Sequence, residues 1–168
     1  MNHISLNGIR TAFLSLGCKV NSYETEAMRE LFLKAGAESV EFGEPADVYV
    51  INTCTVTNIA DRKSRQMLHR ARHLNPEAVI VAAGCYVQSA GNALLSDGSV
   101  DLLVGNNQKK EIVNLVYAYL QDRSFVNEIA DMGSQSVTRS GYEELEIDSA
   151  AEKVRAFIKI QDGCNQFC

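Results

Sequence analysis

The chain has 168 residues, 46% of them hydrophobic and 22% charged, with a net charge of −5. This balance is typical of a globular protein. No stretch reaches the ~20 consecutive apolar residues of a membrane span, so we expect a cytoplasmic protein without a transmembrane helix. The acidic balance argues against a nucleic-acid-binding surface over the whole molecule. The five cysteines lack the dense spacing of secreted scaffolds, which disfavours a disulfide framework and leaves metal ligation or burial.

Apolar runs and 3.6-residue periodicity alternate along the first 120 residues. The continuously apolar runs are typical of strands covered on both faces, and Gly36 suits the end of the first helix. In chain order we predict a strand at 11–16, a helix at 22–35, strands at 38–42 and 48–51, a helix from 57 or 58 to 74, a strand at 78–83, a short helix to 95, a strand at 100–104 and a helix from 106 or 107 to 120.

This alternation predicts an α/β fold, with a parallel sheet wound like flavodoxin or a Rossmann half and helices on both faces. We expect residues 1–120 to form that domain. Residues 121–150 are polar and acidic and show no sustained period, so we interpret them as a connector. The alternating run at 154–160 predicts one more strand, which would open a second domain over residues 151–168.

Three cysteines, Cys18, Cys54 and Cys85, each follow the end of a predicted strand. Loops at the carboxyl ends of parallel strands meet at one edge of the sheet, so we expect the three thiols to lie close together. Three thiolates can bind a [4Fe–4S] cluster and leave one iron open to another ligand. The alternative for each cysteine is a buried small hydrophobe. Structural zinc fits less well, because it favours paired C-x-x-C ligands and a fourth ligand.

Two asparagines, Asn21 and Asn52, lie close in sequence to these cysteines. Their side chains could donate hydrogen bonds to cluster sulfurs, and such bonds tune the reduction potential. Ordinary turn chemistry is the alternative.

The last two cysteines, Cys164 and Cys168, form a C-x-x-x-C motif directly after the predicted strand at 154–160. We interpret this motif as the first part of a C-x-x-x-C-x-x-C cluster loop, whose third cysteine would lie beyond the present end. The chain is therefore expected to be a fragment of a longer protein.

The segment 61–73 carries five basic residues against one acid. A helix with this charge could face an anion such as a nucleic-acid backbone, and the alternative is a solvated helix face. The basic residues are Arg62, Lys63, Arg65, Arg70 and Arg72.

Four segments of the chain resemble the N-terminal part of the radical S-adenosylmethionine methylthiotransferases. The matching segments are LGCKVNSYETE at 16–26, VINTCTVT at 50–57, AGCYVQ at 83–88 and IQDGCNQFC at 160–168. The resemblance implies that Cys18, Cys54 and Cys85 bind an auxiliary [4Fe–4S] cluster. It also implies that Cys164 and Cys168 are the first two ligands of a second [4Fe–4S] cluster, which binds and cleaves S-adenosylmethionine.

The sequence Gly-Cys-Lys-Val-Asn at 17–21 most resembles the branch of this family that acts on threonylcarbamoyladenosine in tRNA. The other branches act on isopentenyladenosine in tRNA or on an aspartate of a ribosomal protein. The resemblance implies addition of a 2-methylthio group beside the anticodon, contact with the tRNA anticodon stem-loop, and a reductant such as flavodoxin or ferredoxin. Because a ligand cysteine and the catalytic barrel are missing, the fragment alone should be inactive.

Two readings from other classes of protein remain. A flavodoxin-like binding or electron-transfer module would use the cysteines structurally, although the chain has neither a G-x-G-x-x-G fingerprint nor a phosphate loop. A zinc protein would bind zinc tightly and show no iron–sulfur colour.

Overall fold

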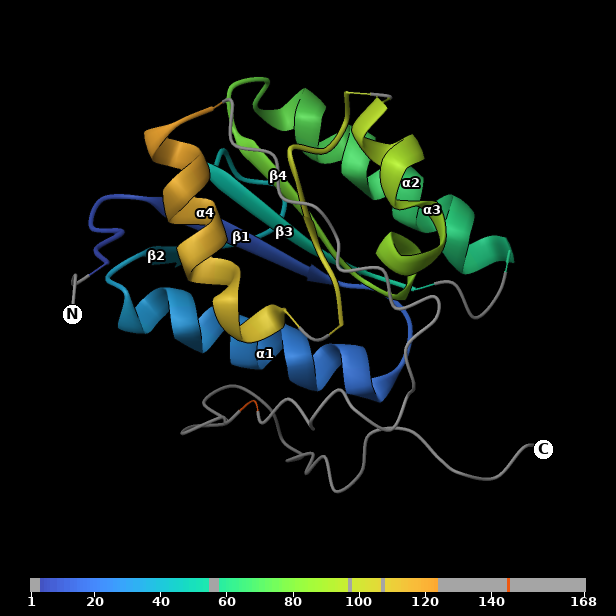
Figure 1. Cartoon of the computed structure of the whole chain (residues 1–168), viewed down its shortest axis with the longest axis horizontal. Helices are drawn as coiled ribbons and strands as arrows, with labels where there is room; N and C mark the ends of the chain where they lie inside the picture. The colour runs from blue at the N-terminus through green and yellow to red at the C-terminus, as the bar shows by residue number, and fades with distance from the viewer. Residues whose placement is uncertain (1–3, 55–57, 97, 107, 124–144, 146–168) are drawn as a thin grey trace.

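The computed structural model describes residues 4–54, 58–96, 98–106, 108–123 and 145. Within these residues, one parallel sheet runs in the order β2-β1-β3-β4-β5 (Figure 1). Its strands are β1 (Arg10–Ser15), β2 (Glu38–Val40), β3 (Val48–Thr53), β4 (Val79–Gly84) and β5 (Leu102–Val104).

Helices cover both faces of this sheet (Figure 1). Helices α1 and α4 pack on one face, and α2 and α3 pack on the other. The order 2-1-3-4-5 is that of the flavodoxin-like doubly wound folds, so the predicted fold class is confirmed. The helices are α1 (Lys19–Lys34), α2 (Asn58–Leu74), α3 (Cys85–Ser96) and α4 (Ile112–Gln121), the last preceded by the 3₁₀ turn η1 (Lys109–Glu111).

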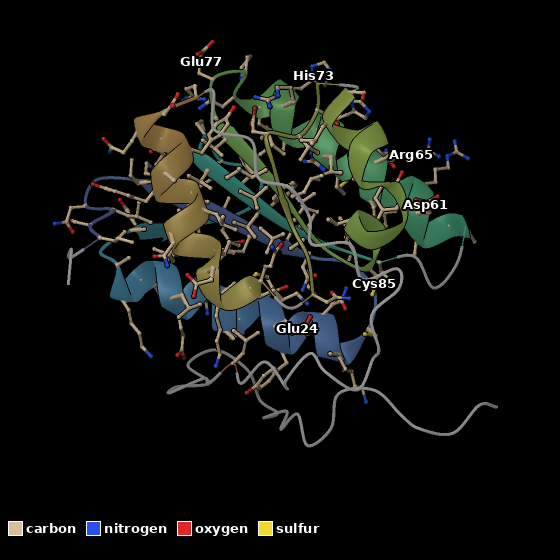
Figure 2. The ribbon with its side chains drawn as sticks, in the orientation of Figure 1. Glu24, Asp61, Arg65, His73, Glu77 and Cys85 are labelled. Carbon is tan, nitrogen blue, oxygen red and sulfur yellow. The ribbon has the colours of Figure 1, made fainter. Side chains whose placement is uncertain are left out.

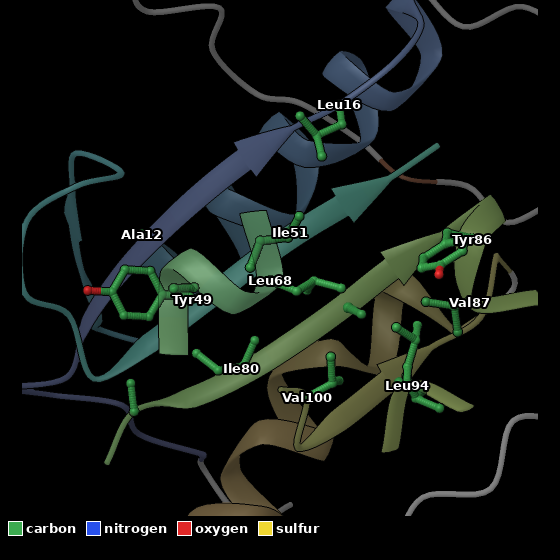
Figure 3. Close-up of a cluster of buried hydrophobic side chains, with 14 of the residues drawn as sticks. Ala12, Leu16, Tyr49, Ile51, Leu68, Ile80, Tyr86, Val87, Leu94 and Val100 are labelled. Atoms are coloured by element: carbon green, nitrogen blue, oxygen red, sulfur yellow. The ribbon is translucent and has the colours of Figure 1, made fainter. Parts of the chain in front are cut away.

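The core lies in two layers, one on each face of the sheet. Every residue of β3 and β4 is buried, as the apolar runs at 48–51 and 78–83 predict, and β3 also buries the polar residues Asn52 and Thr53. Successive side chains of a strand point to opposite faces, so β3 places Tyr49 and Ile51 in one layer and Val48 and Val50 in the other. Figure 3 shows the first layer, in which Leu68 of α2 packs against the sheet. None of the described helices is long and apolar enough to cross a membrane.

The structure differs from the sequence-based expectations at several element boundaries. Helix α1 begins at Lys19, three residues before the predicted start. Its N-cap is Cys18, whose side chain makes no capping hydrogen bond, so the usual polar start signal is missing. The predicted last helix begins as the 3₁₀ turn η1 and becomes α-helical only at Ile112. The predicted strand at 154–160, Cys164 and Cys168 lie outside the described residues.

Candidate metal centre

The carboxyl ends of β1, β3 and β4 form one rim of the sheet. These strands are neighbours, and Asn52 of β3 pairs with Ser15 of β1 and with Ala83 of β4, so the strands end at nearly the same level. Cys18 follows β1 by three residues, while Cys54 and Cys85 directly follow β3 and β4. The backbone therefore brings the three cysteine loops to the same rim.

This rim includes the point where the winding of the sheet reverses. The connection after β1 forms α1 on one face, and the connection after β3 forms α2 on the other face. In doubly wound folds ligands bind outside the carboxyl ends of the strands at this reversal, because the two connections diverge and leave a crevice. Cys18 and Cys54 lie at the starts of these two connections.

Two glycines let the cysteine loops touch. Gly17 has φ +102° and lies so close to Cys54 that an added Cβ would be 2.6 Å from its Sγ. Gly84 has φ +91°, and an added Cβ there would be 2.4 Å from Oδ1 of Asn52. Residues with a Cβ rarely adopt this backbone conformation, and none would fit these spaces. The loops of Cys18 and Cys85 thus both pack on the end of β3.

The side chains of Asn21 and Asn52 lie beneath the same rim. Nδ2 of Asn21 donates to the carbonyls of Leu16 at 2.8 Å and Thr53 at 3.0 Å. Nδ2 of Asn52 donates to the carbonyl of Asn21 at 3.0 Å. Both hydrogens of the Asn21 amide are therefore used by the protein backbone, and a role for either asparagine as a donor to cluster sulfurs stays a prediction.

The three thiols differ in environment. Cys18 is exposed, and its Sγ lies 3.5 Å from Oδ1 of Asn21, to which it donates. Cys54 is only 3% exposed, and its backbone N–H donates to Oγ of Ser64 on α2 at 3.4 Å. Cys85 is half-buried at the start of α3 (Figure 2). All three are free cysteines.

The donor set fits an iron–sulfur cluster, because three soft thiol ligands sit on touching loops of one rim. Over the described ranges, however, no three His, Cys, Asp or Glu side chains are grouped closely enough to hold a metal ion. The backbone brings the three cysteine loops to one rim, while the expected gathering of the sulfur atoms around one centre stays a prediction.

The basic residues of α2 fall into two groups. Arg62, Lys63, Arg65 and Arg70 are exposed. Arg72 instead donates to the carbonyls of Pro76 and Ala78, and it pairs with Asp101 at 2.7 Å. It therefore serves the amino edge of the sheet, whereas the other four side chains are exposed and could meet an external anion.

A buried ion pair, Glu24 with Lys109, was not anticipated from the sequence. The two charged groups are 2.5 Å apart, and their side chains are 8% and 1% exposed. Nζ of Lys109 also lies 3.2 Å from Oδ1 of Asn106. The pair ties α1, on which Figure 2 labels Glu24, to the turn η1 after β5. The two residues are 85 positions apart, and no local pattern marks either of them.

Solved structures with similar backbones support the fold alone. A response regulator from Thermotoga maritima matches with a TM-score of 0.50 and 10% identity, over 68% of this chain and 99% of that one. The response regulator DrrB, also from Thermotoga maritima, matches with a TM-score of 0.51 and 12% identity, over 68% of this chain and 54% of that one. Identities this low carry no information about function.

Curated relatives are more similar in sequence. The threonylcarbamoyladenosine tRNA methylthiotransferases MtaB of Bacillus subtilis and Aquifex aeolicus are 44% and 40% identical, over 94% and 95% of this chain. A tRNA-2-methylthio-N(6)-dimethylallyladenosine synthase of Anaplasma phagocytophilum is 29% identical over 92% of the chain. The chain spans only about a third of these relatives, 34%, 38% and 34% of their lengths.

A family model described as "Uncharacterized protein family UPF0004" matches residues 10–105. The match runs from the first residue of β1 to just past β5, and it contains Cys18, Cys54 and Cys85. Since it covers more than half of the sequence, the chain belongs to the UPF0004 family.

Proposed function

We propose that this chain is part of a tRNA methylthiotransferase that acts on threonylcarbamoyladenosine, and that it contributes an auxiliary [4Fe–4S] site. The observation that carries the proposal is the placement of Cys18, Cys54 and Cys85 after three adjacent parallel strands, on loops that touch. Relatives named as threonylcarbamoyladenosine tRNA methylthiotransferases are 28–44% identical, and those at 36–44% exceed the 29–30% of the dimethylallyladenosine synthases, which supports this substrate branch.

In the proposed site, Cys18, Cys54 and Cys85 are the three ligands. When bound, a [4Fe–4S] cluster with three protein ligands offers an open iron to an external sulfur ligand. The chain supplies the rest: Gly17 and Gly84 let the ligand loops approach each other, and the burial of Cys54 keeps water from one side of the site.

We propose that residues 1–120 are the auxiliary-cluster domain and that residues 151–168 belong to a domain that binds S-adenosylmethionine. Cys164 and Cys168 would be two ligands of its cluster, with residues 121–150 as the connector. Support comes from the C-x-x-x-C spacing and the resemblance alone. The methyl- and sulfur-transfer activity is assigned to the whole protein and not to this chain by itself.

We also propose that the protein works in the cytoplasm on the tRNA anticodon stem-loop, with a flavodoxin or ferredoxin as reductant. The exposed basic side chains of α2 support contact with a phosphate backbone, because clustered positive charge attracts nucleic acid without regard to sequence. The contact residues would be Arg62, Lys63, Arg65 and Arg70.

Anaerobic reconstitution with iron and sulfide tests the auxiliary site. The Cys164→Ala/Cys168→Ala double variant is the parent, so that only the rim cysteines can act as ligands. We expect about four irons per chain and broad visible absorbance. Adding Cys18→Ala, Cys54→Ala or Cys85→Ala should abolish most of both. No iron uptake by the parent would reject the site and favour a binding module, while tight zinc without colour would favour a zinc protein.

Nucleoside mass spectrometry tests the substrate. In cells that lack the full-length gene, threonylcarbamoyladenosine should lose its 2-methylthio group while 2-methylthio-isopentenyladenosine persists. Reintroducing the gene should restore the group, and the Cys54→Ala variant should not. Persistence of the modified threonylcarbamoyladenosine would remove this substrate and point to isopentenyladenosine or to a ribosomal aspartate.

A further inference from the structure

The two asparagines below the rim are hydrogen-bonded to the backbone of the cysteine loops. We propose that Asn21 and Asn52 are positioning residues, which lock the loop of Cys18 onto the end of β3 and so fix the three ligand loops before a cluster binds. The role of these hydrogen bonds in cluster binding rests on the proposed function. The hydrogen bonds themselves, which we call the lock, do not depend on that function.

Asn21 joins the ends of two strands beyond their last backbone hydrogen bond. That last bond runs from the N–H of Leu16 to the carbonyl of Asn52 at 2.9 Å. Further along the chain, Nδ2 of Asn21 bridges the carbonyls of Leu16 and Thr53 at 2.8 and 3.0 Å. One buried amide, on a residue that is 4% exposed, thereby holds together the backbone that leads to Cys18 and to Cys54.

Asn52 completes the lock from the other side. It is fully buried, and its Nδ2 donates to the carbonyl of Asn21 at 3.0 Å, so that each asparagine side chain binds backbone near the other. Its Oδ1 faces Gly84, where an added Cβ would lie 2.4 Å away. Asn52 therefore contacts the loops that carry Cys18 and Cys85, and it stands two residues before Cys54.

The hydrogen bonds of the Asn21 side chain distinguish a positioning role from a direct hydrogen bond to a cluster. Asn21 has two amide hydrogens, and both are used by carbonyls. Its remaining Oδ1 accepts from the thiol of Cys18 at 3.5 Å. Removing the amide would leave two buried carbonyls unpaired, which favours opening of the loop.

The alkylation rate of each cysteine in the metal-free chain measures how often the cysteine loops open. In the wild-type chain, exposed Cys18 should react fast and Cys54, 3% exposed, slowly. In Asn21→Ala and in Asn52→Ala, Cys54 should react about tenfold faster, because loop opening is no longer opposed by these hydrogen bonds. Asn75→Ala is the matched control: its Nδ2 donates to the carbonyl of Ala46 at 2.9 Å at the amino edge, and Cys54 should react as in the wild type.

Circular dichroism decides whether each variant is folded before its alkylation is read. If both rim variants unfold, amide hydrogen exchange of the wild type decides: the N–H groups of Leu16 and Ser22 should exchange slowly, at the rate of the central sheet. Unchanged Cys54 reactivity in a folded rim variant, or fast exchange at these two amides, would overturn the proposal.

Reconstitution then separates the lock from the proposed function. Folded Asn21→Ala should bind iron with a lower yield and an altered electron paramagnetic resonance spectrum after reduction, while Asn75→Ala should match the wild type. If the wild type takes up no iron but Cys54 is released in Asn21→Ala, the lock stands and the cluster function fails. If iron binds normally in a variant whose Cys54 stays protected, the lock fails and the cluster function stands.

Discussion

At the residue scale, the structure of the rim requires the glycines before Cys18 and Cys85, because no other residue type fits at these two positions. Each has a positive φ, and each lacks room for a Cβ against β3. The sequence placed Cys18, Cys54 and Cys85 correctly on one rim, because apolar runs fix where strands end and parallel strands end together. It did not show the contacts through Gly17 and Gly84, since these depend on which strands are neighbours.

Gly84→Ala should destabilise the chain by about 3 kcal/mol, because backbone strain adds to overpacking against Asn52. Gly8→Ala is the control, since Gly8 also has a positive φ, +80°, but has nothing within 4 Å of an added Cβ. It should cost about 1 kcal/mol from strain alone. Urea denaturation measures both, and equal costs would show that the close contact with Asn52 adds nothing.

The buried pair of Glu24 and Lys109 supplies a second prediction. Lys109→Ala should cost about 3–5 kcal/mol, because it leaves the carboxylate of Glu24 buried without its main cationic partner. The double variant Lys109→Met/Glu24→Gln should recover most of this loss, since it removes both charges. Lys34→Ala is the control: its side chain is 56% exposed and lies 4.0 Å from Glu30, so the loss should be about 0.5 kcal/mol or less. A double variant as unstable as Lys109→Ala would mean that packing, and not charge, stabilises this contact.

At the element scale, helix α2 has an apolar side that packs on the sheet and a basic side that is exposed. Leu68 and Ala71 are fully buried, whereas Arg62 and Arg65 are exposed. The 3.6-residue period predicted this helix and its charge. It did not predict that Arg72 turns to Asp101, because the contact joins residues 29 positions apart.

Reversal of charge on α2 should weaken binding of a tRNA anticodon stem-loop to the full-length protein. Arg62→Glu/Arg65→Glu should lower affinity about tenfold or more at low salt and flatten the salt dependence, because the two proposed phosphate contacts would be lost. Lys34→Glu is the control: it reverses one charge at the C-terminal end of α1 and should have little effect on the affinity for the stem-loop. Fluorescence anisotropy at two salt concentrations measures this, and equal losses in both variants would indicate a nonspecific charge effect.

At the scale of the whole molecule, the two edges of the sheet differ in what they hold. The carboxyl rim carries the cysteines, whereas the amino edge carries a polar network centred on Asp101. This carboxylate accepts from Arg72 of α2, from the N–H of Ile80 and from the hydroxyl of Tyr119 on α4. It therefore joins the helices of both faces. Burial and the charge of Asp101 raise the pKa of Tyr119, which keeps its hydroxyl protonated as the donor.

The strand order was only partly predictable. An alternation of strands and helices is compatible with both the flavodoxin and the Rossmann order, and the choice depends on where each crossover packs. The polar residues that stabilise this choice, such as Asp101 and Arg72, bond across long sequence separations and leave no periodic signal. The placement of the three cysteine loops at one rim was easier to predict than the strand order, because both candidate orders bring strand ends to one rim.

Because the two edges hold different groups, substitutions at the amino edge and at the carboxyl rim should affect different properties, namely stability and iron uptake. Asp101→Ala should lower stability by about 3 kcal/mol, because it leaves the partly buried guanidinium of Arg72 without its carboxylate partner and the N–H of Ile80 without its acceptor. At urea concentrations too low to unfold it, the Asp101→Ala variant should still take up iron like the wild type. Cys18→Ala should do the opposite, with loss of iron and a stability change within about 0.5 kcal/mol, because Cys18 is exposed. Urea denaturation and iron analysis of both variants measure this. Loss of iron uptake in folded Asp101→Ala would mean that the amino edge controls the geometry of the rim, and the two edges would then act as one unit.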